Sequence, residues 1–262
     1  MSNAAMLALG FCVVFVMNAL GAALVFLFRG NISEKINTLF LGFASGVMTA
    51  ASVFSLLLPA IEQAQGWGRW NFLPAVVGFL AGGAFLVLLD KLIPHLHYGT
   101  NEEEGPRVAL ARPARLFFAV TIHNIPEGLA VGLAFGAAAT EGTQAGFLAA
   151  LLLAVGIGIQ NFPEGAAIAL PMKAATGSRW KAFGLGTLSG AVEPLFALVG
   201  YVLAAYLAAA QPWLLSFAAG AMVFVVAEDL IPEAKLEGHP HLSAWGVMAG
   251  FAVMMALDVA FG

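Results

Sequence analysis

Eight long apolar runs constrain the fold of this chain more than any other feature. Each run is long enough to cross the hydrocarbon core of a bilayer as a helix, which takes about 20 residues. None alternates in the manner of a transmembrane barrel strand. The sequence therefore predicts an all-α, polytopic membrane protein in which residues 1–262 form one transmembrane domain. The runs cover roughly residues 5–28, 36–61, 71–94, 114–138, 144–172, 180–208, 212–234 and 242–261.

Composition supports this class and excludes others. The chain is 61% hydrophobic and 10% charged, whereas about 25% of residues are charged in a soluble domain. The single cysteine, Cys12, excludes an internal disulfide framework and a multi-cysteine metal site. The net charge of −4 comes without a basic stripe, so no nucleic-acid partner is expected.

The basic residues predict an orientation, because cytoplasmic loops of membrane proteins are enriched in Lys and Arg. An external N-terminus places only Arg69 on the outer side. We therefore expect a multi-pass protein of the cell (inner) membrane with both termini outside. The inner loops then carry 10 of the 11 basic residues, namely Arg29, Lys35, Lys91, Arg107, Arg112, Arg115, Lys173, Arg179, Lys181 and Lys235.

The 95–112 segment is the one insert that resembles a soluble loop. It contains His95, His97 and the acidic run Glu102–Glu104. We expect a solvated, flexible cytoplasmic loop. The alternative is a weak site that collects metal ions on the cytoplasmic side.

Two nearly identical motifs carry the chemistry. Residues 123–128 read His-Asn-Ile-Pro-Glu-Gly, and residues 160–165 read Gln-Asn-Phe-Pro-Glu-Gly. The spacing of His123 and Glu127 places both on one helix face. Imidazole nitrogen and carboxylate oxygen suit zinc and its first-row neighbours. Each internal proline also frees a backbone carbonyl, and irregular backbone at this depth is tolerated only inside protein or along a watery cavity.

Buried carboxylates strengthen the prediction of a cation path. Glu127, Glu164 and Glu193 lie well inside apolar runs, with every Lys and Arg assigned to a loop or helix end. Each unpaired carboxylate at that depth costs about 3 kcal/mol. The glutamates must therefore be protonated when empty or neutralised by cations, and proton release on metal binding would follow.

Internal similarity predicts inverted-topology repeats, with helices 1–3 related to helices 6–8 and helix 4 related to helix 5. Residues 43–48 read Phe-Ala-Ser-Gly-Val-Met, and residues 217–222 read Phe-Ala-Ala-Gly-Ala-Met. The two runs cross the membrane in opposite directions, and a Leu-Pro or Ile-Pro pair follows each. The alternative is that small residues and methionine recur in any membrane helix.

The paired motifs resemble those of the ZIP (Zrt/Irt-like) family of divalent metal transporters, in its bacterial GufA-type branch. The resemblance covers the whole chain. It implies transport of zinc, and also of cadmium, iron or manganese, toward the cytoplasm by a homodimer in which helices 1, 4, 5 and 6 move against the others. It further implies a binuclear midplane site between helices 4 and 5. The implied ligands are Met48, His123, Glu127, Gln160 and Glu164 for the first metal, and Asn124, Asn161, Glu127, Glu164 and Glu193 for the second.

The chain departs from many relatives at two of these positions. Gln160 stands where they have histidine, which predicts less strict zinc selectivity, because an amide is a poorer zinc ligand than imidazole. Asn161 replaces an acidic residue, which weakens the second metal position.

Further acidic and histidine residues near the two ends of the array are candidates for an ion path. Glu62 and Asp258 predict an acidic entry that would concentrate cations. Asp90, His95, Glu228 and Asp229, together with His97, Glu233, His239 and His241, predict an exit. Their alternative is helix-end solvation and pairing with Lys91 and Lys235.

Two rival functions remain at this point. An intramembrane metallohydrolase would use helical His and Glu to hold a zinc that activates water, but no His-Glu-x-x-His motif is present. A metal sensor would bind metal without carrying it. We expect a transporter and no enzyme activity.

Overall fold

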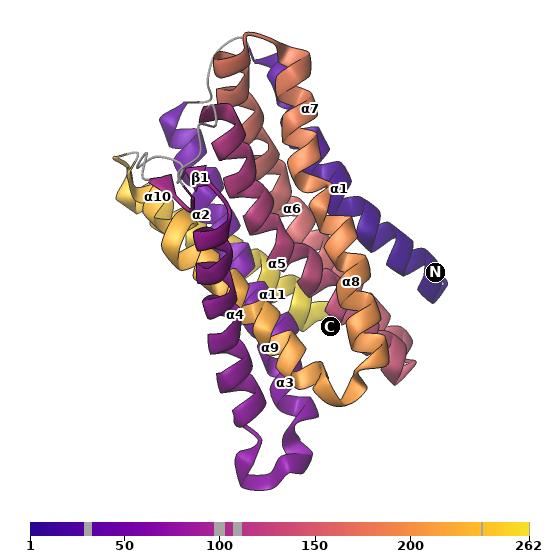
Figure 1. Cartoon of the computed structure of the whole chain (residues 1–262). Helices are drawn as coiled ribbons and strands as arrows, with labels where there is room; N and C mark the ends of the chain where they lie inside the picture. Colours follow the sequence, from indigo (N-terminus) through magenta and orange to yellow (C-terminus); the bar gives the residue numbers. More distant parts are fainter. Residues whose placement is uncertain (29–32, 97–102, 107–111, 237, 262) are drawn as a thin grey trace.

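The chain folds as a bundle of membrane-length helices (Figure 1). The computed structural model describes residues 1–28, 33–96, 103–106, 112–236 and 238–261. Within these residues, eight helical segments are long and apolar enough to cross a membrane, which confirms the predicted number and fold class. They are Asn3–Leu27, Glu34–Gln63, Leu73–Leu92, Phe117–Glu141, Gln144–Thr176, Arg179–Tyr206, Ala208–Ala234 and Pro240–Ala260.

Three of the eight spans consist of more than one element. The second combines α2 (Glu34–Ala51), η1 (Ser52–Leu57) and α3 (Leu58–Gln63), and the sixth combines α7 (Arg179–Gly190) and α8 (Val192–Tyr206). The seventh combines η3 (Ala208–Ala210), α9 (Gln211–Val225), η4 (Val226–Leu230) and α10 (Ile231–Leu236). The other elements are α1 (Asn3–Leu27), η2 (Gln65–Trp70), α4 (Leu73–Leu92), β1 (His95–Leu96), β2 (Glu103–Glu104), α5 (Arg112–Glu141), α6 (Gln144–Thr176) and α11 (Pro240–Phe261).

The insert between α4 and α5 contains the short strands β1 and β2. They pair antiparallel, with His95 opposite Glu104 and Leu96 opposite Glu103. The predicted flexibility of the 95–112 loop stays a prediction, because residues 97–102 and 107–111, including His97 and Glu102, lie outside the described part of the chain.

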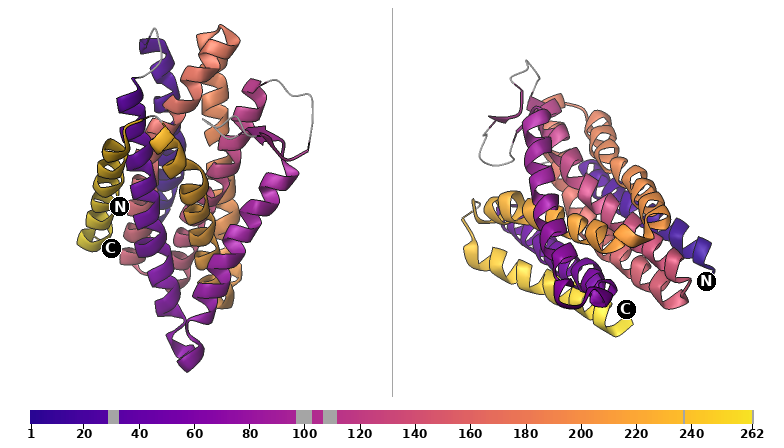
Figure 2. Two further views of the ribbon diagram at one scale, coloured as in Figure 1. Left: turned by 90° about the vertical axis from the view of Figure 1, so that its left-hand side faces the viewer. Right: turned by 60° about the horizontal axis from the view of Figure 1, so that its bottom comes forward.

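The helices pack as four close pairs that fall into two groups (Figures 1 and 2). In the first group α1 lies along α6, and α5 lies along α8. In the second group α2 lies along α11, and α4 lies along α9. Contacts of α6 with α2 and of α5 with α9 join the two groups. The motif-bearing helices α5 and α6 therefore lie in one group and face the other.

A glycine permits the close approach within each pair. A Cβ added to Gly132 of α5 would lie 2.8 Å from Ala197 Cα of α8, and one added to Gly46 of α2 would lie 2.6 Å from Phe251 N of α11. Gly82 of α4 and Gly165 of α6 have the same role against Ala221 of α9 and Ala22 of α1, at 2.7 and 3.0 Å. Small residues let membrane helices pack backbone against backbone, which is the main source of association without a hydrophobic driving force.

Prolines set the interruptions in the second, sixth and seventh spans. Pro59 and Pro232 follow π-helical turns, where Leu58 N donates to Val53 O and Ile231 N donates to Val226 O, five residues back. A wider turn of this kind accommodates the hydrogen bond that proline cannot make. The sixth span breaks at Ala191, between α7 and α8, shortly before Pro194.

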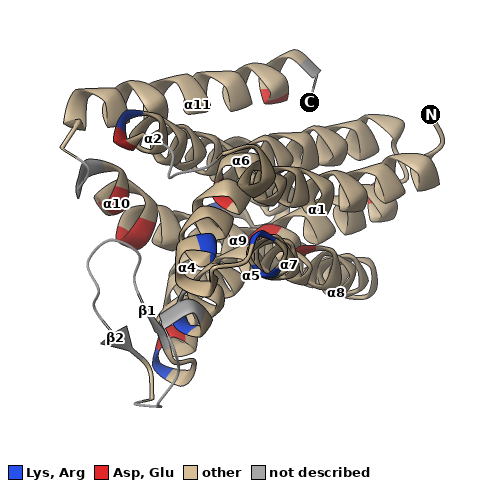
Figure 3. Cartoon of the chain, turned by 90° about the horizontal axis from the view of Figure 1, so that it is seen from above, with Lys and Arg blue, Asp and Glu red and all other residues tan. Residues whose placement is uncertain are grey.

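Seen from above, Lys and Arg lie at the ends of several helices, and α11 carries few charged residues along its length (Figure 3). One end of the bundle, here called the basic end, holds Lys35, Lys91, Lys173, Arg179 and Lys181. Arg69 lies in η2 at the opposite end. The basic end is at the top of Figure 1. The sequence pattern also places these basic residues on one side of the membrane and Arg69 on the other.

Candidate metal site

The two motifs lie on α5 and α6, which contact each other. Both helices continue through their internal prolines, Pro126 and Pro163. Both motifs therefore lie inside long, continuous helices. The two helices that carry the motifs thus contact each other within one helix group.

A chain of amide hydrogen bonds connects the second motif to the broken sixth span. Gln160 Nε2 donates to Asn161 Oδ1 at 2.6 Å. The Asn161 amide nitrogen donates to Glu193 Oε2 of α8 and, at 3.2 Å, to Val14 O of α1. Asn161 thus ties α6 to α1 and α8. Its side-chain oxygen accepts the hydrogen bond from Gln160, and the second lone pair of that oxygen is the one available for the predicted ligand role.

Five buried acceptor oxygens around this chain of bonds have no hydrogen-bond partner among the described residues. Both carboxylate oxygens of Glu127 belong to the set, and Glu127 is 1% exposed. The carboxylates of Glu164 and Glu193 are near enough to repel that of Glu127. The other three atoms are Asn124 Oδ1, Gln160 Oε1 and Glu193 Oε1. Buried polar atoms are almost always satisfied, and only a donor or a cation can satisfy this acceptor set.

Asn124 shows how the backbone fixes the direction of one of these oxygens. Its amide nitrogen donates to Ser189 O near the end of α7 at 3.1 Å. A carboxamide has its donor and acceptor on opposite sides of one planar group. Holding the nitrogen against α7 therefore turns Asn124 Oδ1 away from α7, as a free acceptor.

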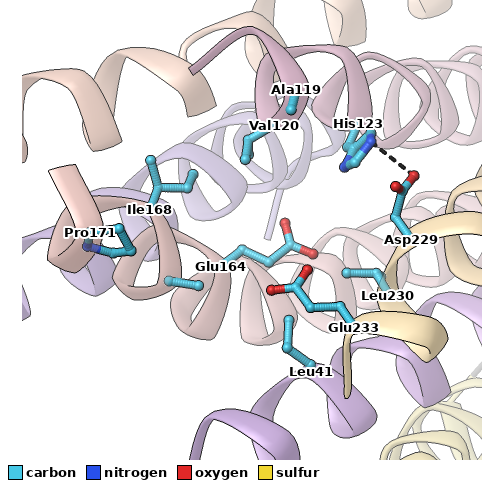
Figure 4. Close-up of a pocket in the computed structure, with 11 residues that line it drawn as sticks. Leu41, Ala119, Val120, His123, Glu164, Ile168, Pro171, Asp229, Leu230 and Glu233 are labelled. Atoms are coloured by element: carbon cyan, nitrogen blue, oxygen red, sulfur yellow. Dashed lines mark ion pairs between the residues drawn. The ribbon is translucent and has the colours of Figure 1, made fainter. Parts of the chain in front are cut away.

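His123 and Glu164 line a small cavity on the side of the motifs nearer the basic end (Figure 4). The cavity is about 60 Å³ in volume and also contains Asp229 and Glu233 from the seventh span. His123 Nε2 lies 3.2 Å from Asp229 Oδ2, with the two side chains 18% and 12% exposed. The ion pair joins α5 of one helix group to η4 of the other. The carboxylates of Glu164 and Glu233 point into the same space (Figure 4).

A larger cavity of about 500 Å³ opens at the end opposite the basic end. Glu62 and Asp258, the two residues predicted for an entry, both line it. Asp258 accepts a hydrogen bond from Ser55 Oγ of η1 at 3.0 Å. Glu141, at the end of α5, lines the same cavity and was not among the predicted residues. The ionisable side chains that line this cavity are therefore all acidic.

The remaining residues that the sequence predicted for an exit do not all lie together. Asp90 and Glu228 line a third cavity, of about 300 Å³, together with Lys91. The sequence analysis had grouped Asp229 with them, but it lies beside His123 instead. His95 lies in β1, and its side chain is outside the described part of the chain.

Met48 is fully buried in α2 within the apolar core and does not line the cavity beside His123. Among the residues that the structure describes, no three His, Cys, Asp or Glu side chains form a group that could hold a metal ion. A complete coordination shell in this arrangement therefore needs the amide oxygens as well as the carboxylates.

Two buried polar residues that contact the motifs were not identified in the sequence analysis. Asn18 of α1 is 1% exposed and donates from Nδ2 to Gly186 O of α7 at 2.8 Å. Ser189, whose carbonyl holds Asn124, is fully buried and donates from Oγ to the same Gly186 O at 2.8 Å. The signal was present for Asn18, because it is a carboxamide in the middle of an apolar run.

Comparison with known proteins agrees with this description. Residues 111–258 match the family model described as "ZIP Zinc transporter". The chain is 39% identical to human "Zinc transporter ZIP11", with 94% of each chain covered. It is 39% identical to "Zinc transporter ZIPB" of Bordetella bronchiseptica, covering 97% of this chain and 81% of that protein. It is 37% identical to "Zinc transporter GufA" of Myxococcus xanthus, covering 92% and 93%. The chain belongs to the ZIP family of transporters, and the GufA-type branch is consistent with these relatives.

Proposed function

We propose that this protein carries divalent transition-metal cations, zinc first, across the cell membrane toward the cytoplasm. The observation that carries the proposal is the set of five buried, unpartnered acceptor oxygens around Glu127. An apolar surrounding makes such a set costly unless a cation enters it. Members of this family are transporters rather than enzymes, and relatives of this chain bear the name zinc transporter, which supports the same function.

The site that we propose is binuclear and lies between α5 and α6. His123, Glu127, Gln160 and Glu164 would bind the first ion, with Met48 as a thioether ligand. Asn124, Asn161, Glu127, Glu164 and Glu193 would bind the second. Oxygen dominates this set, and oxygen ligands are less selective for zinc than imidazole or thiolate. Cadmium, iron and manganese are therefore proposed as further substrates.

The route begins at the large acidic cavity and ends near the basic end. Glu62 and Asp258 would attract cations at the outer end. Beyond the midplane, Asp229 would receive the ion from His123, since the two side chains are already in contact. Asp90, His95 and Glu228 would follow. The gathering of Lys and Arg at the basic end supports placing that end in the cytoplasm and both termini outside.

We also propose that the two helix groups move against each other during transport. We propose further that the fold consists of two inverted repeats and that the protein is a homodimer. The proposed repeat relation exchanges spans 1, 2 and 3 with spans 6, 7 and 8, and span 4 with span 5. Under this exchange the close pair of α1 and α6 becomes the close pair of α8 and α5. The same exchange turns the α2–α11 pair into the α9–α4 pair. The matching π-helical turns before Pro59 and Pro232 support the same relation. Alternating access by one repeat against the other is a common transporter plan.

Zinc and cadmium entry into proteoliposomes that contain a metal-sensitive dye tests the transport proposal. The wild type should give saturable flux, and Glu127→Ala should abolish it. Glu141→Ala is the matched control, because it removes an exposed carboxylate of the same helix at its outer end. It should retain flux at saturating metal.

Each other outcome has a distinct meaning. Unchanged flux in Glu127→Ala would refute the proposed site. Zinc binding without flux in the wild type would favour a sensor. Lipid or peptide cleavage that depends on His123 would contradict the absence of enzyme activity.

A further inference from the structure

We propose that Asn18 of α1 is a positioning residue that holds the break of the sixth span and thereby aims Glu193 at the metal site. The inference rests on the proposed transport function but concerns a residue outside both motifs. Asn18 is 1% exposed, and its amide nitrogen donates to Gly186 O at 2.8 Å. The residue is therefore a buried polar contact between α1 and α7.

Asn18 occupies the place where three helices meet. A Cβ added to Gly190 at the end of α7 would lie 2.6 Å from Asn18 Cγ. A Cβ added to Gly165 of α6 would collide with the Asn18 backbone carbonyl. Gly165 is the last residue of the second motif. Asn18 thus lies against both the motif helix and the broken helix, and it contacts each of them at a glycine.

The end of α7 accepts side-chain hydrogen bonds from two other helices. Pro194 has no N–H, so the carbonyl of Gly190, four residues before it, lacks its helical partner, and α7 ends at that residue. Asn124 donates to Ser189 O from the α5 side, and Asn18 donates to Gly186 O from the α1 side. The two carboxamides hold the end of α7 from two different helices.

Glu193 lies three residues beyond Gly190, in the first turn of α8. The helix N-terminus there favours a carboxylate, and Asn161 orients the Oε2 atom. Glu193 Oε1 is left as one of the unpartnered oxygens. Any rotation of the α7 end moves this oxygen, because only Ala191 and Val192 lie between Gly190 and Glu193. Asn18 therefore acts on the metal through Glu193 and not as a ligand.

The test is a double-mutant cycle on equilibrium zinc binding by the full-length protein in detergent micelles. The four proteins are the wild type, Asn18→Leu, Glu193→Gln and the double variant. Leucine has the same branched arrangement of non-hydrogen atoms as asparagine but cannot donate to Gly186 O. Asn18→Leu should weaken zinc binding about tenfold, the effect of a lost buried hydrogen bond. In the Glu193→Gln background it should change affinity by less than about twofold.

Gln211→Leu is the matched control. Gln211 is also a buried carboxamide, and it donates from Nε2 to Ala204 O near the far end of α8 at 3.0 Å. Its substitution should leave zinc affinity within about twofold of the wild type. Equal losses in Gln211→Leu and Asn18→Leu would mean general helix stabilisation and would overturn the inference.

Two further results would also overturn it. One is a tenfold loss from Asn18→Leu that persists in the Glu193→Gln background, and the other is wild-type affinity in Asn18→Leu. If Asn18→Leu fails to fold, Asn18→Ala replaces it, because it removes the amide without pressing on Gly165 and Gly190. Unchanged zinc binding in Glu127→Ala would refute the proposed metal site, on which the inference rests. If Asn18→Leu binds zinc as tightly as the wild type while Glu127→Ala does not bind zinc, only the role of Asn18 is refuted.

Discussion

At the scale of single residues, the site is defined by acceptors that lack donors. Asn161 and Asn124 donate from their amide nitrogens to Glu193, Val14 and Ser189, and Asn124 Oδ1 has no partner among the described residues. Neither carboxylate oxygen of Glu127 has a hydrogen-bond partner among the described residues. In an ordinary protein interior, hydrogen-bond donors would lie next to these oxygens. The arrangement therefore favours the binding of a cation over the metal-free state.

Glu127→Gln tests this at one residue, since the amide keeps the shape of the carboxylate and removes its charge. With zinc at about 100 times its Kd, the wild type should gain about 2.7 kcal/mol of stability. The variant should gain less than about 0.5 kcal/mol under the same zinc concentration. Its metal-free form should be at least as stable as the wild type, because an unpaired buried charge is costly. Thermal unfolding in detergent, with and without zinc, measures both.

Glu141→Gln is the control for that measurement and should keep the zinc-dependent stabilisation. An equal zinc response in Glu127→Gln and the wild type would place the binding energy elsewhere in the molecule.

At the scale of elements, glycine contacts decide which helices pair. Gly132 brings α5 against α8, and an added methyl group would meet backbone atoms of Ala197 that cannot move aside. The pair carries Glu127 on one helix and Glu193 on the other. Packing and site geometry therefore depend on the same contact.

Gly132→Ala should destabilise the protein by about 1–3 kcal/mol through overpacking. Gly184→Ala is its matched control, because a Cβ there meets nothing within 4 Å. In that open helical position alanine should be neutral or stabilise by up to about 1 kcal/mol. Unfolding midpoints in detergent compare the two, and similar values would show that the α5–α8 contact is looser than the structure has it.

At the scale of the whole molecule, charge is asymmetric between the two ends of the bundle. The cavity opposite the basic end is lined by Glu62, Glu141 and Asp258, whereas Lys and Arg gather at the basic end. Such a distribution orients the protein during insertion and attracts cations to one mouth.

Orientation is tested by cysteine labelling in intact cells after replacement of Cys12 by serine. A membrane-impermeant maleimide should modify Arg69→Cys and should leave Gly177→Cys, at the end of α6, unmodified until the cells are lysed. The reverse pattern would invert the proposed topology.

The acidic mouth is tested by Glu62→Gln. Its KM for zinc should rise at low salt, where the field of the mouth extends about 30 Å at 10 mM ionic strength. The difference from the wild type should shrink at 1 M salt, where screening acts within about 3 Å. An effect of equal size at both ionic strengths would indicate direct coordination instead of attraction.

Sequence by itself determined the fold class, the eight spans, the two motifs and the family, because each follows from local facts. Apolar length fixes a span, and the spacing of His123 and Glu127 fixes a shared helix face. Only the tertiary structure decided which polar atoms meet. It paired His123 with Asp229 across the two helix groups, joined Asn161 to Glu193, and left Met48 in the apolar core. It also brought in Asn18, 168 residues from its partner Gly186. Contacts between helices depend on where glycines allow close approach and where prolines end a helix, and a one-dimensional pattern does not specify the partner helix.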